Sequence, residues 1–273
     1  MNTEYKFDAK EAYEKIKAEM TKWAKETGAC NFVLGISGGK DSTITAALLS
    51  AIFGRNSVYG VMLPCGEQKD ISDSERVVGA LGIHDMTINI GGAFDSILSK
   101  IRATGVLPSS DCKINLPPRL RMATLFAVGQ TINARVINTD NLTETMLGYS
   151  TFGGDNFGCF SPIGQLTVQE VKALGHYVVN NELKLYQDER NTLNELIEKT
   201  PADGLQDKTD EENLGMKYAD VDAFIREDKG DPLFKHNVIM RYAKNKFKHE
   251  IVQMPCVKFD YENYIVNFYN EMI

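Results

Sequence analysis

The chain contains no apolar run long enough to cross a bilayer, and no hydrophobic segment follows Met1, so we expect neither a membrane-spanning helix nor a secretory signal. Its five cysteines are widely spaced, odd in number and never paired as C-x-x-C. This argues against a zinc knuckle or a disulfide framework and favours reduced thiols in the cytoplasm. With a formal net charge of −7, the chain also lacks the basic face of a nucleic-acid-binding protein. These absences predict a cytoplasmic protein that binds neither membranes nor nucleic acids.

Internal repeats and low-complexity linkers are also absent, so we expect a single domain over residues 1–273. Four short, mostly apolar segments are typical of strands: 31–36, 58–63, 86–90 and 135–138. Helical spacing or helix-start residues mark 8–27, the segment after Gly39, 72–82, 94–102 and 116–133. This alternation predicts an α/β fold, a Rossmann-like doubly wound parallel sheet over 10–145. A Gly-rich loop and a mostly helical part follow over 146–273.

The segment Phe32–Thr43, FVLGISGGKDST, is the most informative part of the chain. A buried strand breaks into Ser-Gly-Gly, and a helix follows, so free backbone N–H groups and the positive end of the helix dipole face any ligand there. Gly38 and Gly39 allow a tight turn and a close approach to an anion. Asp41 places a carboxylate where a metal ion on a polyphosphate could be held. The segment therefore predicts a pyrophosphate-binding loop.

This loop is neither a Walker loop, which needs G-x-x-x-x-G-K-[ST], nor the dinucleotide fingerprint G-x-G-x-x-G. The pattern S-G-G-x-D-S after a strand resembles the PP-loop of the ATP pyrophosphatases, which cleave ATP between its α- and β-phosphates. Several later blocks, in their order and spacing, resemble the ammonia-dependent NAD synthetases within that group. The blocks are Leu116–Met122, Asn138–Glu144, Gly148–Tyr149, Gly153–Asp155, Ser161–Pro162, Lys199–Leu205 and Thr209–Gly215.

The resemblance implies a two-step reaction in which deamido-NAD is adenylated by ATP, with release of pyrophosphate, and ammonia then displaces AMP to give NAD. The chain has no room for the glutaminase domain of the glutamine-dependent enzymes, so free ammonia is the expected nitrogen donor. The resemblance also implies a homodimer. Asp41 and Glu144 match the family's catalytic magnesium ligands, so Mg²⁺ is the expected metal. ATP contacts fall on Gly35, Ile36, Ser37, Gly38, Gly39, Lys40, Asp41, Ser42 and Thr139. Deamido-NAD contacts fall on Arg119, Phe152, Asp155, Cys159 and Lys248, with Arg121 as a rival to Arg119.

Four positions depart from the family pattern. Phe152 stands where the family has a cation, Cys159 where it has an acid, Val168 where it has an ATP-binding lysine and Ala202 where it has a hydroxyl. No histidine stands in a matching block, so we expect Cys159 to be an inert thiol rather than a nucleophile.

The lysine missing at position 168 has two possible substitutes. Lys172 lies one helical turn further on, on the face of Val168, and Lys40 lies in the loop itself. Two alternatives to NAD synthesis stay open: a PP-loop ATP pyrophosphatase that adenylates a different substrate, and a nucleotide-binding homologue without turnover. Retention of both Asp41 and Glu144 disfavours the second of these.

Overall fold

The computed structural model describes residues 5–67, 71–199, 209–250, 257 and 264–272. Within these ranges the core of the fold is a parallel sheet of four strands in the order β3-β2-β1-β4. The strands are β1 (Asn31–Gly35), β2 (Val58–Met62), β3 (His84–Thr87) and β4 (Ala134–Val136). The chain runs outward from β1 to β3 and then returns to the other side of β1 as β4. Open α/β sheets bind ligands at such a reversal, beyond the carboxyl ends of the strands.

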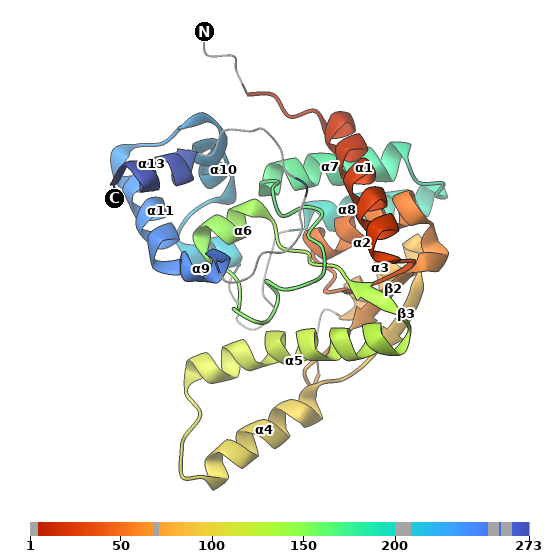
Figure 1. Ribbon diagram of the computed structural model, residues 1–273, viewed down its shortest axis with the longest axis horizontal. Coiled ribbons are helices and arrows are strands. Elements are labelled where there is room, and N and C mark those ends of the chain that lie inside the picture. Colours follow the sequence, from red (N-terminus) through yellow and green to blue (C-terminus); the bar gives the residue numbers. More distant parts are fainter. Residues whose placement is uncertain (1–4, 68–70, 200–208, 251–256, 258–263, 273) are drawn as a thin grey trace.

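Alternation along β1 divides the core between the two faces of the sheet. Phe32 and Leu34 point into one cluster of buried side chains, and Val33 points into the other. The first cluster is formed with α1 (Ala9–Thr27), α2 (Lys40–Phe53), α3 (Ile71–Leu81), α7 (Val168–Asn181) and α8 (Gln187–Glu198). The second is formed with α5 (Ser110–Thr131), and α4 (Gly91–Ala103) packs beside α5 on that side (Figure 1). Helices therefore cover both faces, as predicted.

A third cluster of buried side chains lies beside the sheet rather than on it. It joins α6 (Leu142–Leu147) to α9 (Asp210–Leu214), α10 (Tyr218–Glu227), α11 (Pro232–Asn245) and α13 (Tyr264–Met272), which gather at one end of the molecule in Figure 1. The short elements η1 (Arg55–Ser57) and α12 (Phe247–Glu250) complete the order. Because α6 follows β4, this cluster supports the residues that come directly after the sheet.

Two predicted boundaries are wrong for identifiable reasons. The helix expected to open at 116 begins at Ser110, because Ser109 caps it by accepting a hydrogen bond from Cys112 N at 3.1 Å, and Pro117 lies inside the helix. The third strand begins at His84 rather than at 86. It is an edge strand with three of its four residues exposed, so apolar composition does not mark its start.

The remaining predicted elements agree with the structure to within a few residues. No helix in the described ranges combines the length and apolar character needed to span a membrane. Cys30, Cys65, Cys112 and Cys159 are free thiols, whereas Cys256 and Ala202 lie outside the described residues.

Candidate functional site

A cavity of about 380 Å³ opens at the carboxyl ends of β1 and β4. The loop after β1 forms one wall, and the segment from Ile137 to Asp140 after β4 forms another. Side chains of α5, of the segment around 149–155 and of the two residues Lys199 and Asp210 complete the lining. These residues are Pro118, Arg121, Met122, Leu125, Tyr149, Asp155, Lys199 and Asp210. The reversal of strand order thus coincides with the cavity, as in other open α/β folds.

The loop after β1 has the backbone geometry of an anion-binding turn. Gly38 has a φ of 79°, and a Cβ at this position would lie 2.7 Å from the Cβ of Asp73, so the position requires glycine. Gly39 caps α2 without a side-chain acceptor, which leaves N–H groups of the first turn available to a ligand. The hydroxyls of Ser37 and Ser42 lie 3.1 Å apart, and the Ser42 hydroxyl donates to Gly39 O at 3.1 Å. These bonds fix the loop around its free N–H groups.

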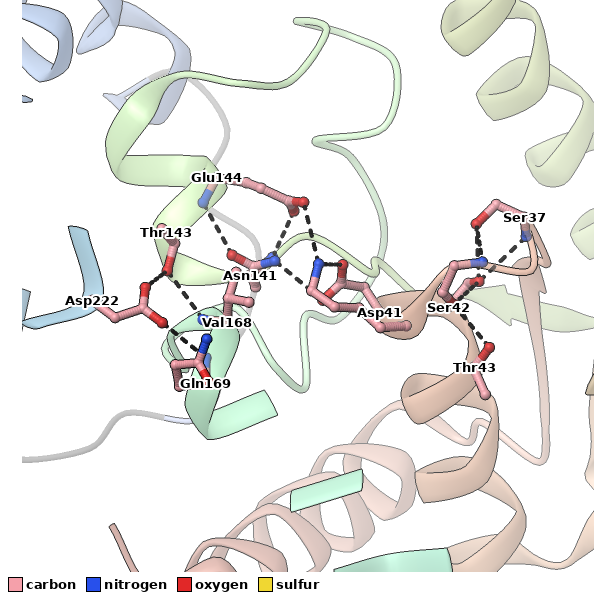
Figure 2. A network of polar contacts seen from close by, with 12 residues as sticks. Ser37, Asp41, Ser42, Thr43, Asn141, Thr143, Glu144, Val168, Gln169 and Asp222 are labelled. Carbon is pink, nitrogen blue, oxygen red and sulfur yellow. Dashed lines mark hydrogen bonds and ion pairs between the residues drawn. The ribbon is translucent and has the colours of Figure 1, made fainter. Parts of the chain in front are cut away.

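Two carboxylates meet a buried lysine beside this loop. The Lys40 ammonium lies 2.7 Å from Asp41 Oδ2 and 4.0 Å from Glu144 Oε1, and Lys40 is only 3% exposed. Asn141 joins the two acids, because its Nδ2 donates to Asp41 Oδ1 at 3.1 Å and its Oδ1 accepts from Glu144 N at 3.0 Å (Figure 2). Asn141 is also the N-cap of α6. The cap that starts this helix therefore positions Glu144 opposite the loop.

Burial and mutual repulsion shift the ionisation of this cluster. Burial, together with the charge of Asp41, raises the pKa of Glu144, while Lys40 opposes that rise. Burial also raises the pKa values of Asp140 and Asp155. For Lys40, burial favours the neutral amine, but the charges of Asp41 and Glu144 outweigh it and raise the pKa of the ammonium. The surrounding acids therefore favour the charged form of Lys40.

The donor set fits a metal ion that arrives with its own phosphate ligands. Mg²⁺ is commonly held by one or two carboxylates plus substrate phosphates and water. Asp41 and Glu144 supply two such carboxylates next to the loop. The described residues contain no cluster of three or more His, Cys, Asp or Glu arranged to hold a metal. Asp41 and Glu144 therefore suit a shared site with a nucleotide better than a complete protein-only site.

The family model for NAD synthase matches residues 12–255, which is most of the chain. The chain belongs to the NAD synthase family. Among curated proteins it is 31% identical to the NH(3)-dependent NAD(+) synthetase of Mycoplasmopsis pulmonis, over 85% of this chain and 84% of that protein. It is 33% identical to the enzyme of the same name from Alkaliphilus metalliredigens, over 84% and 90% of the two chains. These matches confirm the resemblance that the sequence blocks indicated.

Solved structures agree with this family assignment. A structure of NMN synthetase from Francisella tularensis has a TM-score of 0.79 and 27% identity, covering 92% of this chain and 99% of that one. An NAD+ synthetase from Burkholderia pseudomallei has a TM-score of 0.70 and 25% identity, over 90% and 92% of the two chains. The predicted ATP pyrophosphatase type of fold is thus confirmed.

Within this NAD synthase fold, the predicted ATP residues converge. All eight from Gly35 to Ser42 line the cavity, as do Thr139, Glu144 and Asp155. Asp155 Oδ1 accepts a hydrogen bond from Thr151 N at 2.6 Å, which fixes the loop that carries it. The ligand roles of these residues stay predictions, but the fold brings the side chains to one place.

The other predicted acceptor residues do not line the cavity. Arg119 is exposed, and its Nε donates to Phe152 O at 3.1 Å. Lys248 donates to the carbonyls of Gly148 at 2.7 Å and Ser150 at 2.8 Å. Cys159 is partly buried against the second face of the sheet. These contacts hold the 148–160 loop in place.

Lys172 does not replace the family lysine. Its ammonium pairs with Glu198 at 2.9 Å, and Lys172 is not among the residues that line the cavity. Val168 is itself buried, and its N–H donates to Thr143 Oγ1 at 3.1 Å (Figure 2). Of the two possible substitutes, Lys172 is therefore not supported by the structure. Lys40, the second cation proposed from the sequence, does lie in the cavity.

Sequence reasoning ranked one cavity residue too low and missed others. Arg121, the rival of Arg119, lines the cavity, where its Nε donates to Leu63 O at 3.0 Å and burial lowers the pKa of its guanidinium. Lys199 and Asp210 also line it, and both stand in sequence blocks that carried the resemblance. The position of these residues within those blocks was the signal that could have identified them. The sequence does not indicate in which direction their side chains point.

Proposed function

We propose that this protein uses ATP and ammonia to convert deamido-NAD to NAD through an acyl-adenylate. The observation that carries the proposal is the meeting of the S-G-G-x-D-S loop, Thr139 and Glu144 in one cavity, in a chain whose NAD synthase match spans residues 12–255. Ammonia as nitrogen donor is supported by the names of the curated relatives, which are NH(3)-dependent NAD(+) synthetases.

In the first step a nicotinate carboxylate oxygen attacks the α-phosphorus of ATP, and the bond from that phosphorus to the bridging oxygen breaks to release pyrophosphate. The N–H groups at the start of α2, with Gly38 and Gly39, bind the phosphates. Thr139 contacts the nucleotide from the other wall. Asp41 and Glu144 would hold Mg²⁺, which neutralises phosphate charge when bound. The residues of this chain thus align the two reactants and stabilise charge, which is the main catalytic requirement in phosphoryl-group chemistry.

In the second step the nitrogen of ammonia attacks the acyl carbon, the carbon–oxygen bond to AMP breaks, and the nitrogen loses one proton. Asp155 lines the acceptor side of the cavity. We assign Arg119, Phe152, Cys159 and Lys248 to the same recognition, through the 148–160 loop that they contact or belong to. These residues then affect the binding of deamido-NAD indirectly, by positioning that loop.

We also infer that the protein forms a homodimer. The sequence offers apolar residues of α5 for such an interface, but these residues, Leu120, Leu125, Phe126 and Val128, pack largely inside the chain against the second face of the sheet. The connection between α4 and α5 instead exposes apolar side chains, and Leu107 is 84% exposed. Burial of this connection in a subunit interface accounts for it. Light scattering at working concentration tests this, and a monomeric mass contradicts it.

The test of function is an incubation with Mg-ATP, ammonium and deamido-NAD in which pyrophosphate and NAD are both followed. Equal amounts of pyrophosphate and NAD are expected. When ammonium or deamido-NAD is left out, neither product should accumulate over many turnovers. Asp41→Asn serves as the control that abolishes pyrophosphate release. If the parent protein releases no pyrophosphate, the interpretation that remains is a nucleotide-binding homologue without turnover.

A second candidate, amidation of nicotinate mononucleotide, is favoured by one observation, the similarity to the Francisella NMN synthetase at a TM-score of 0.79. Both candidates place the same nicotinate carboxylate next to the α-phosphate and differ in the remainder of the acceptor. The ratio of kcat/KM values for the two acceptors decides between them. Pyrophosphate release with neither acceptor above background would point to a different adenylated substrate.

A further inference from the structure

Lys40 belongs to the predicted phosphate-binding loop, yet it is a buried lysine. Its side chain is 2% exposed although the residue lines the cavity. The ammonium also lies 5.6 Å from the centre of the Tyr218 ring, in a cation–π arrangement. The two other cationic side chains of the described cavity lining are engaged elsewhere, Arg121 with Leu63 O and Lys199 with Asp73. Lys40 is thus the lining cation that serves Asp41 and Glu144.

Three of the four oxygens of the two carboxylates accept a hydrogen bond within the protein, and the fourth lies at ion-pair distance from Lys40. Asp41 Oδ1 accepts from Asn141 Nδ2 at 3.1 Å, and Asp41 Oδ2 accepts from Lys40 at 2.7 Å. Glu144 Oε2 accepts from Asn141 N at 3.4 Å, and Glu144 Oε1 lies 4.0 Å from the ammonium (Figure 2). A divalent ion that bridges the two acids on the side facing Lys40 would lie about 2.0–2.1 Å from an oxygen of each, for Mg²⁺. The ammonium and the ion cannot share that space.

We propose that the Lys40 ammonium is the resident cation of the Asp41–Glu144 pair, so that a divalent metal enters this position only together with a nucleotide. The phosphates of the nucleotide supply the negative charge to which the ammonium moves, and its flexible stem permits a short displacement. The inference rests on the proposed function in one respect, the assignment of Asp41 and Glu144 as the carboxylates that would hold the metal. It makes Lys40 a positioning residue that couples metal entry to nucleotide binding.

The test is a titration of nucleotide-free protein with Mn²⁺, followed by the electron paramagnetic resonance signal of the free ion. Lys40→Met and Lys40→Gln remove the charge, and both are expected to bind Mn²⁺ at least about tenfold more tightly than the parent, or about 1.4 kcal/mol. Lys172→Met is the matched control, because it removes a paired lysine outside the cavity and should stay within about twofold of the parent. Adding Asp41→Asn to either Lys40 variant should abolish the gain.

Equal Mn²⁺ affinity in the parent and the Lys40 variants would overturn the inference, as would a gain that survives Asp41→Asn. A measurement on the parent alone gives a further check that needs no variant to fold. Micromolar Mn²⁺ without nucleotide should not raise its Tm, because a ligand that binds the folded state must raise it. Such a rise would also overturn the inference. None of these readouts depends on the acceptor, so they fail independently of the NAD and pyrophosphate assay.

Discussion

The environment of Lys40 leads to a quantitative prediction about stability. The losses in the free energy of unfolding caused by removing its two carboxylate partners should be strongly non-additive. Asp41 contacts the ammonium at 2.7 Å, and Glu144 remains at 4.0 Å when Asp41 is replaced. From the sequence alone, Asp41→Asn should hardly change stability, since the carboxylate would belong to a metal site rather than to packing. The structure changes this expectation, because Asp41 is the nearest counter-charge of a buried lysine.

The magnitude follows from the two distances. At 4 Å an ion pair is worth about 4 kcal/mol at an effective dielectric constant of about 20. Leaving a buried charge with no partner costs roughly 3–5 kcal/mol. Asp41→Asn and Glu144→Gln each leave one carboxylate in place, so each should lower the free energy of unfolding by only roughly 1–2 kcal/mol. The double variant removes both of these carboxylates, leaves the weaker influences of Asp210 and of the Tyr218 ring, and should cost roughly 3–5 kcal/mol.

The assay is urea unfolding of metal-free protein for the parent, both single variants and the double variant, at pH 9, where both carboxylates are charged because burial and Asp41 raise the pKa of Glu144 to about 8. Trp23 is the single tryptophan, and its ring packs 4.9 Å from that of Phe160, so its fluorescence reports the core beside α1. Far-UV circular dichroism provides the second probe that a two-state treatment needs. The double variant should lose at least about 1 kcal/mol more than the sum of the singles, whereas additivity within about 0.5 kcal/mol would refute the reasoning.

Three further predictions concern other parts of the molecule. Lys172→Met should leave the rate of ATP cleavage within about twofold of the parent and cost under about 1 kcal/mol, because its partner Glu198 is a largely exposed carboxylate; a tenfold loss of rate would return Lys172 to the site. Burial raises the pKa of Asp222 from 3.8 to about 6, so the folded state binds the extra proton between these values. The stability of the parent relative to Asp222→Asn should then fall by roughly 2 kcal/mol as pH rises from about 4 to 6, and a flat difference in urea unfolding contradicts this. Gly148→Ala should lower Tm far more than Gly153→Ala. Both glycines have positive φ, but only a Cβ at 148 meets a side chain of α11, at 2.2 Å, and equal losses would contradict the steric reason.

The nucleotide side of the site was predictable because its signals are local. A strand, two glycines and a helix start follow one another within the segment 32–43, and each agrees with the others. Thr139 and Glu144 follow β4, which pairs with β1 in the sheet. Because these two strands are parallel, their carboxyl ends lie at the same edge. The division of the chain into a core at 10–145 and a later part at 146–273 stays a prediction.

The acceptor side was less predictable because it depends on rotation of a helix. Arg119 and Arg121 lie two residues apart on α5, which turns them about 200° from each other at 3.6 residues per turn. Which of them faces the cavity follows from how α5 packs on the sheet, and the sequence placed the start of this helix six residues too late. Val168 occupies the position of the family's ATP-binding lysine, but its burial against α6 and α10 makes it a packing residue, which the sequence alone does not show.

The site has two parts whose amino-acid sequences can vary to different degrees. The loop from Gly35 to Ser42 is built by neighbours in sequence, so its geometry survives wherever the motif does. The 148–160 loop is held instead by distant residues, Arg119 on α5 and Lys248 on α12, through bonds to backbone carbonyls. Bonds to carbonyls do not constrain the side chains of the loop, so these can vary without loss of the anchors. A change of acceptor between a dinucleotide and a mononucleotide would therefore be expressed in this loop while the adenylation step stays intact.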